Sequence, residues 1–281
     1  MCAILAVDSP VKPLVFANFL APNMTPVYAE VATRVGRALG RRTELIVGSA
    51  FDQLSDGSVD IAFLCGFPYV RLSRYRPGML QPLAAPVLDE PRYQDRPVYF
   101  SDVIVRADSG FQGFTDLRGQ TWAYNDKDSF SGCLLVRHHL LQLGENDGFF
   151  GRVMFSGGHQ ESIRMVLDGE ADASAIDSQV LSVERLRNPV LAESLRVIGA
   201  LGPSTIPPVV ATAAVPDGVQ AGARDALCAL GSDPASRHVL AGGLIRRFTP
   251  IDDRAYDDIR RAWAAVEASV PRGNELAGLG A

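Results

Sequence analysis

Short apolar runs alternate along the chain with segments in which apolar residues recur at helical spacing. The runs at 14–19, 43–48 and 59–64 predict strands, and apolar residues three or four positions apart between 27 and 39 predict a helix. A helix that joins two strands of these lengths is typical of a βαβ unit, whose strands pair in parallel. The N-terminal part of the chain is therefore expected to belong to the α/β class.

The same alternation continues through the second half of the chain. Further strands are predicted at 98–105, 121–124, 152–155, 171–176, 195–199 and 209–215. Further helices are predicted at 133–143, 160–167, 219–230 and 253–268. Two of the strands, at 59–64 and 171–176, begin with an apolar residue, an aspartate and an apolar residue. This repetition suggests two similar lobes with a ligand cleft between them, since ligands of open α/β sheets bind at the carboxyl ends of strands.

Composition and charge narrow the class of protein. Apolar residues make up 47% of the 281 residues and charged residues 21%, which is the balance of a globular protein. No apolar run approaches the ~20 residues of a membrane-spanning helix. A formal net charge of −5 argues against nucleic acid as the main partner. The four cysteines form no CxxC pair, so we expect no metal site, and we expect no cofactor either.

A polar loop that joins a predicted strand to a predicted helix is the first candidate site. This loop, 125–132, ends in Ser129, Phe130, Ser131 and Gly132. The first amides of a helix lack backbone partners and carry partial positive charge, so serine hydroxyls beside them can bind a phosphate-like or carboxylate anion. The alternative is that one serine simply caps the helix.

Two further polar residues are expected at the same sheet edge. His159 follows Ser156-Gly-Gly between a strand and a helix, where it could donate a hydrogen bond to an anion. The alternative is a histidine with a purely structural role. Asp177 stands just past the strand at 171–176, a usual place for a ligand contact, but it could equally cap the next helix.

The segment after the third predicted strand supplies the remaining candidates. Gly66 permits close approach of the backbone. Phe67 and Tyr69 can wall a pocket together with Phe19, at the end of the first strand. Cys65 can act as a nucleophile only where its thiolate is stabilised. Ordinary loop packing is the alternative. The sequence contains no GxSxG, Walker A, HExxH or GxGxxG motif, so the signatures of several enzyme classes are missing together.

Three blocks of sequence, in this order, resemble a known family. They are Asp60-Ile-Ala-Phe-Leu-Cys-Gly-Phe-Pro-Tyr-Val70, Ser129-Phe-Ser-Gly132, and Ser156-Gly-Gly-His-Gln-Glu-Ser-Ile163 followed by Gly169-Glu-Ala-Asp-Ala-Ser-Ala-Ile-Asp-Ser178. They are similar to the phosphate-, phosphite- and phosphonate-binding components of ABC transporters, the PhnD-like family. The resemblance extends from about Leu14 to Ala268.

The resemblance implies a type II periplasmic-binding-protein fold. In that fold two α/β lobes are joined by two crossover strands and trap the ligand between them. The crossovers are expected near 99–105 and 209–215, so that residues 1–101 with 209–281 form one lobe and residues 102–208 form the other. Each lobe is expected to contain a mixed, mostly parallel sheet flanked by helices.

The resemblance also implies roles for particular residues. In the family the serine loop and the histidine hold the phosphonate oxygens, which carries over to Ser129, Ser131 and His159. An acidic or amide residue after the later strand contacts the other end of the ligand, which carries over to Asp177.

The chain departs from the family pattern at two positions. Leu64-Cys65 stands where the family often has a tyrosine, and Phe130 stands where it often has a threonine. A hydrogen bond to a charged ligand contributes about 1.5–3 kcal/mol. Two such contacts are lost and an aromatic ring is added, so a larger or more apolar anionic metabolite is an alternative ligand.

We therefore expect a monomeric solute-binding protein that closes on a small anionic ligand, without catalysis, and delivers it to an ABC permease. One alternative is a cytoplasmic enzyme on this fold, of menaquinone- or thiamine-precursor type, with His159 or Cys65 as the reactive group. Another is a ligand sensor. The sequence as given has no export signal. We expect an extracytoplasmic location if a leader was removed, with Cys2 as a candidate acylated cysteine, and a cytoplasmic one if the chain is complete.

Overall fold

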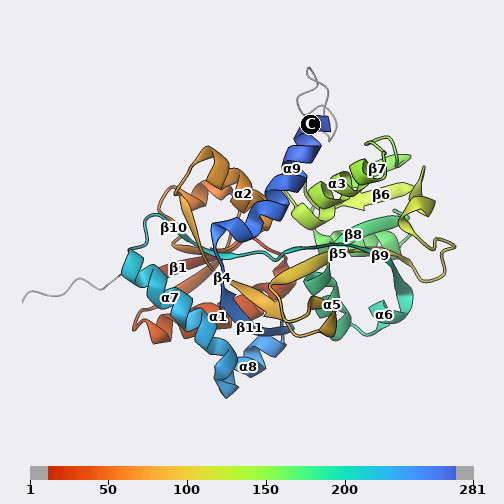
Figure 1. Cartoon of the computed structure of the whole chain (residues 1–281). Helices are drawn as coiled ribbons and strands as arrows, with labels where there is room; N and C mark the ends of the chain where they lie inside the picture. Colours follow the sequence, from red (N-terminus) through yellow and green to blue (C-terminus); the bar gives the residue numbers. More distant parts are fainter. Residues whose placement is uncertain (1–11, 270–281) are drawn as a thin grey trace, which may run out of the picture.

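Two separate sheets form the framework of the computed structural model, which describes residues 12–269 (Figure 1). The first sheet has the strand order β11-β4-β10-β3-β1-β2. Its strands are β1 (Leu14–Asn18), β2 (Thr43–Val47), β3 (Ile61–Phe63), β4 (Leu80–Leu88), β10 (Val209–Thr212) and β11 (Ile245–Pro250). The second sheet has the order β7-β6-β8-β5-β9. Its strands are β5 (Val98–Arg106), β6 (Thr121–Tyr124), β7 (Arg152–Phe155), β8 (Ala173–Asp177) and β9 (Leu195–Thr205). We call the elements around these sheets the first lobe and the second lobe.

Each sheet is parallel along one side and antiparallel along the other. β1 pairs in parallel with β2 and β3, and β6 pairs in parallel with β7 and β8. In the first sheet β10 pairs antiparallel with β3 and β4, and β11 with β4; in the second, β5 pairs antiparallel with β8 and β9. The sheets are thus less parallel than the βαβ pattern predicts, because β10 enters the first sheet from the second lobe and β5 enters the second sheet from the first lobe.

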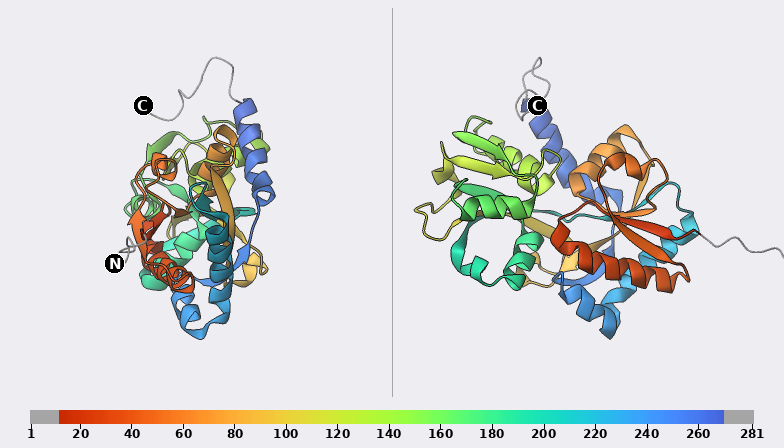
Figure 2. Two further views of the ribbon diagram at one scale, coloured as in Figure 1. Left: turned by 90° about the vertical axis from the view of Figure 1, so that its left-hand side faces the viewer. Right: turned by 180° about the vertical axis from the view of Figure 1, so that it is seen from behind.

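Helices cover both sheets and the junction between them. Their bounds are α1 (Thr25–Ala38), α2 (Gly66–Tyr75), α3 (Leu135–Gln142), α4 (His159–Leu167), α5 (Ser178–Arg187), α6 (Val190–Ser194), α7 (Asp217–Ala229), α8 (Pro234–Ala241) and α9 (Asp257–Ser269). α1, α7 and α8 pack together beside the first sheet, and α4 and α5 pack against the second. The view from behind in Figure 2 shows α1 (red) along the first lobe, with the green helices of the second lobe beside it.

Two connections carry the chain between the lobes. Residues 89–97 link β4 to β5, and residues 206–208 link β9 to β10. β5 pairs with strands of the second sheet along its length, so a boundary between residues 101 and 102 would cut a strand. The strands β5 and β10 that follow these connections overlap the positions 99–105 and 209–215 at which crossovers are expected from the sequence.

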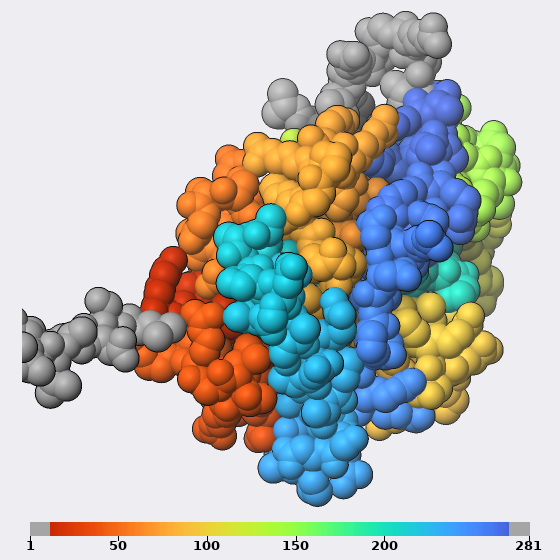
Figure 3. Space-filling view, turned by 60° about the vertical axis from the view of Figure 1, so that its left-hand side comes forward, coloured from red at the N-terminus to blue at the C-terminus, as the bar shows by residue number. Residues whose placement is uncertain are grey.

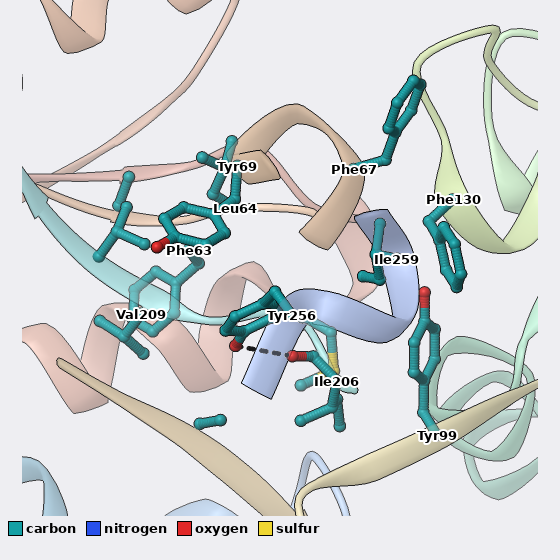
Figure 4. Packing of buried hydrophobic residues seen from close by; sticks show 14 of the residues in the cluster. Phe63, Leu64, Phe67, Tyr69, Tyr99, Phe130, Ile206, Val209, Tyr256 and Ile259 are labelled. Atoms are coloured by element: carbon teal, nitrogen blue, oxygen red, sulfur yellow. Dashed lines mark hydrogen bonds between the residues drawn. The ribbon is translucent and has the colours of Figure 1, made fainter. Parts of the chain in front are cut away.

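The last helix lies across the junction. α9 packs against α2 of the first lobe and against α3 and β9 of the second. Figure 3 shows α9 (dark blue) on the surface between the orange segment of the first lobe and the green segment of the second. At its entry, the Tyr256 hydroxyl donates a 3.1 Å hydrogen bond to the carbonyl of Ile206, in the second connection (Figure 4). α9 is therefore attached to the point where the chain crosses.

A continuous apolar cluster joins the lobes. It contains Phe63 of the first sheet, Tyr99 of the second, Phe130, and Ile259 of α9, all buried (Figure 4). A smaller cluster lies beneath α4 and α5 of the second lobe. Within residues 12–269, no helix combines the length and apolar character needed to cross a membrane. Cys2, considered above as an acylation site, lies outside the described residues.

Candidate functional site

The loop 125–132, here called the serine loop, connects β6 to a helix that begins irregularly. Phe130–Leu134 form a single π-helical turn, and α3 continues from it. Ser129 is the N-cap residue, and its Oγ accepts a 3.1 Å hydrogen bond from the amide of Gly132. Ser129 therefore caps the helix, which is the alternative role that the sequence allows for one serine of this loop. The other serine, Ser131, points its hydroxyl elsewhere.

Ser131 and His159 lie together. The Oγ of Ser131 is 3.3 Å from Nε2 of His159, the first residue of α4. The two residues come from loops that follow the adjacent parallel strands β6 and β7, whose carboxyl ends meet at one sheet edge. Both side chains are buried, and burial lowers the pKa of His159 to about 4 because the imidazolium loses its hydration. The imidazole is therefore neutral near pH 7.

Asn125 completes this cluster, and the sequence reasoning missed it. Its Nδ2 lies 3.3 Å from Nε2 of His159, and it too is buried. Nδ1 of His159 and Oδ1 of Asn125 have no hydrogen-bond partner among residues 12–269. The available signal was position, since Asn125 directly follows β6, where a strand end favours ligand contacts.

Asp177 ends β8 at the same edge. Its Oδ1 accepts hydrogen bonds of 2.8 and 3.2 Å from the amides of Gln179 and Val180, so it caps α5. Burial nevertheless raises the pKa of Asp177 to about 7. Ser101 pairs with Asp177 across the sheet and donates a 2.7 Å hydrogen bond to the carbonyl of Ser131. Ser101 thus lies between Asp177 and the serine loop, since it is paired with the first and hydrogen-bonded to the second.

Cys65 reaches this group from the first lobe. It is the N-cap residue of α2, and hydrogen bonds from the backbone amides of Phe130 and Phe67 act to lower the pKa of its thiol. Burial dominates and raises the pKa of the Cys65 thiol to about 11, and the charge of Asp177 adds to the rise. The thiolate is not stabilised, so the condition set for a nucleophile is not met.

The aromatic candidates separate into different environments. The Tyr69 hydroxyl donates to Asp253, and its ring packs edge-on against Tyr256, away from the serine loop. The Phe67 ring packs edge-on against Trp263 of α9, and Figure 4 shows it and Tyr69 pointing in different directions from α2. An open groove of about 760 Å³ borders Tyr69 between α2, β4 and α9, and it contains no other predicted site residue.

Phe130 and Phe19 also differ in their surroundings. Phe130 is buried in the apolar cluster beside Ile259 and Tyr99, so its ring serves packing (Figure 4). Phe19 is half-buried and packs against Phe51, with ring centroids 5.6 Å apart. The structure thus groups Ser131 with His159, places Ser129, Cys65 and Asp177 next to them, and sets Tyr69 apart.

Direct hydrogen bonds also join the two lobes at α5. Asn23 of the first lobe donates a 3.2 Å hydrogen bond to the carbonyl of Val180, and Gln179 donates a 2.8 Å bond to the carbonyl of Gly243. In this arrangement of the lobes, Ser131 is 3% exposed and His159 8%. In residues 12–269, no group of three or more histidine, cysteine or acidic side chains is arranged to hold a metal ion.

Two α/β lobes, each a mixed sheet flanked by helices, joined by short connections, are the architecture of the type II periplasmic-binding-protein fold. Residues 14–256 match the family described as the phosphonate-binding periplasmic substrate-binding protein of ABC transporters. The chain belongs to this family. Because the family consists of binding components, it favours the solute-binding hypothesis over the enzyme alternative.

Solved structures share the fold at low sequence identity. The methylphosphonate complex of PhnD1 from Prochlorococcus marinus superposes with a TM-score of 0.80 at 17% identity, over 92% of this chain and 99% of that one. A phosphonate-transporter binding protein from Pseudomonas aeruginosa gives 0.79 at 18% identity, over 91% and 87%. An ATP-bound protein from Xanthomonas citri gives 0.67 at 20% identity, over 91% and 97%.

Proposed function

We propose that this protein binds a small tetrahedral oxyanion, of phosphonate, phosphite or phosphate type, between its two lobes. Ser131, His159 and the first amides of the helix that begins at Phe130 hold the anionic group. The observation that carries the proposal is the buried Nδ1 of His159, which has no partner among residues 12–269 and lies in the cluster that contains the Ser131 hydroxyl. A buried unpaired donor costs about 1–3 kcal/mol, and a ligand oxygen removes that cost.

The chemistry of the site suits an anion held by neutral donors. The imidazole of His159 is uncharged near pH 7, because burial lowers its pKa to about 4. Hydroxyl, imidazole and amide N–H groups then supply hydrogen bonds, and the start of the helix supplies partial positive charge. Methylphosphonate bound to the Prochlorococcus marinus relative is an example of such a ligand, and we extend this ligand class to the present chain.

A small ligand is favoured over a larger apolar one. The Phe130 ring, which the sequence suggested as an addition to the binding surface, is 1% exposed and packed within the apolar cluster. It therefore leaves the polar groups of the serine loop as the available contacts. We further propose that the lobes divide at the connections 89–97 and 206–208, and that the protein acts as a monomer that delivers its ligand to an ABC permease.

Isothermal titration calorimetry tests the proposal. Methylphosphonate, phosphite, phosphate, sulfate and acetate are titrated into the wild type, His159→Gln and Tyr69→Phe. We expect at least one phosphorus oxyanion to bind, and His159→Gln to weaken that binding tenfold or more. Tyr69→Phe is the matched control, because its hydroxyl bonds to Asp253 outside the cluster, and it should bind like the wild type. Absence of binding by every anion contradicts the proposal.

A further inference from the structure

One nitrogen of the His159 ring, Nε2, has two polar neighbours. Nε2 lies 3.3 Å from Nδ2 of Asn125 and 3.3 Å from Oγ of Ser131. An amide nitrogen only donates hydrogen bonds, whereas a hydroxyl can donate or accept. Nε2 must therefore accept from Asn125. A neutral imidazole carries one proton, so that proton is on Nδ1.

The Asn125 amide occupies the space that a side chain at position 132 would fill. A Cβ at that position would lie 1.8 Å from Oδ1 of Asn125 and 2.8 Å from its Cγ. No side chain can share this space with the amide. Gly132 therefore allows Asn125 to sit between the serine loop and the imidazole.

We infer that Asn125 is a positioning residue that fixes His159 as the Nδ1–H tautomer and so keeps the imidazole's single proton available for the ligand. The inference rests on the proposed function for its purpose. The position of the proton, however, is a property of the protein without ligand. Asn125 itself acts through His159, since its Nδ2 is directed to Nε2.

The two members of the cluster that contact Nε2 can be separated by substitution. Asn125→Asp keeps the shape of the side chain but offers only oxygen acceptors to Nε2, so the proton should move from Nδ1 to Nε2. Ser131→Ala removes the other neighbour of Nε2 and leaves Asn125 in place. It is the matched control, and its tautomer should equal that of the wild type.

Nitrogen-15 NMR of histidine-labelled protein without ligand reads the tautomer, because protonated and unprotonated ring nitrogens resonate far apart. His159→Gln assigns the signals among the four histidines. We expect a protonated Nδ1 in the wild type and in Ser131→Ala, and a protonated Nε2 in Asn125→Asp. A protonated Nε2 in the wild type, or an unchanged tautomer in Asn125→Asp, overturns the inference. If Asn125→Asp does not fold, Asn125→Ser serves, with loss of the single Nδ1–H form as the expected result.

Binding measured on the same proteins separates this inference from the proposed function. We expect Asn125→Asp to bind methylphosphonate at least tenfold more weakly than the wild type, since Nδ1 then presents a lone pair to the anion. A wild type with Nδ1 protonated that binds no phosphorus oxyanion contradicts the proposed function and leaves the tautomer assignment standing. Equal affinity of Asn125→Asp and the wild type, with the proton moved, overturns the claim that this proton serves the ligand.

Discussion

The guanidinium of Arg71 and the carboxylate of Asp128 form a two-bond ion pair that joins α2 of the first lobe to the serine loop of the second. Nη2 lies 3.1 Å from Oδ2, and Nη1 bonds to Oδ1. The guanidinium also lies 5.9 Å from the ring centre of Phe51 and 5.7 Å from that of Phe67. Both charged side chains are partly buried, so the pair is less screened by water than a fully exposed one.

Removing this ion pair should make the lobes separate more readily. We expect Arg71→Gln to weaken oxyanion binding by about two- to fivefold, because partly exposed pairs contribute up to about 1 kcal/mol. The change should lie mainly in the dissociation rate, measured by stopped-flow mixing. Arg74→Gln is the matched control: Arg74 is on the same helix but pairs with Glu267 of α9. Equal dissociation rates for the two variants would show that the ion pair does not hold the lobes.

Truncation of the two serines should affect different properties of the protein, its stability for Ser129 and its ligand binding for Ser131. Ser129→Ala removes the N-cap hydrogen bond to Gly132 and should lower the free energy of unfolding by about 1 kcal/mol. Ser131→Ala should instead weaken oxyanion binding tenfold or more, since a hydrogen bond to a charged group contributes about 1.5–3 kcal/mol. Urea denaturation and calorimetry on both variants check this. Loss of binding only in Ser129→Ala would transfer the ligand contact to that serine.

Stability should respond to pH in opposite ways through two buried groups. The pKa of His159 falls from 6.5 to about 4 on folding, so its contribution to stability is lost as the pH drops from 6.5 toward 4. The pKa of Asp177 rises from 3.8 to about 7, so its contribution is lost as the pH rises from 3.8 toward 7. Each slope approaches about 1.4 kcal/mol per pH unit, and the two oppose each other between pH 4 and 6.5.

Substitution of each residue should reveal its separate contribution to the pH dependence of stability. Relative to the wild type, His159→Gln should lose stability as the pH rises from 4 to 6.5, and Asp177→Asn, which keeps the helix cap, should lose it as the pH falls. Urea denaturation at several pH values measures the differences, in which the contributions of other carboxylates cancel. Differences that do not vary with pH would mean that neither group titrates as its burial implies.

Glycine is required at one position of the serine loop. In Gly132→Ala the new Cβ would lie 1.8 Å from Oδ1 of Asn125, so the amide must move. We expect a loss of about 1–3 kcal/mol in stability, the usual cost of overpacking, together with weaker oxyanion binding. Gly218→Ala is the control, because its Cβ meets nothing within 4 Å and it lies in α7, where alanine favours the helix. Thermal unfolding compares the two; similar stabilities would refute the steric argument.

Much of the fold follows from local patterns, and the omissions have physical causes. α1 and β5–β8 were predicted within a few residues, because their apolar spacing is regular. α2 was missed, since Gly66 and Pro68 suggest a loop. Pro68 is tolerated because it occupies the first turn, where its missing N–H has no helical partner. β4 was missed too, because it contains Pro82 and Pro86, and proline is uncommon in a strand that has neighbours on both sides.

The candidate site was predictable only as far as backbone position. Adjacent parallel strands bring their carboxyl ends together, and so the sequence could place Ser131 near His159. It could not show which way a side chain points. Phe130 packs into the apolar cluster, and Tyr69 turns to Asp253. Asn125 was missed because an asparagine after a strand is also an ordinary turn residue.

The position of α9 bears on how the ligand space can be reached. The helix packs against α2 of the first lobe, and the Tyr256 hydroxyl at its start is hydrogen-bonded to the carbonyl of Ile206. It also packs against α3 of the second lobe. A rotation that parts the lobes must therefore slide α3 along α9 or pull α9 away from α2. Because α9 also packs against the turn Phe130–Leu134, entry of solute from the solvent is in this way mechanically coupled to the helix on which the serine loop rests.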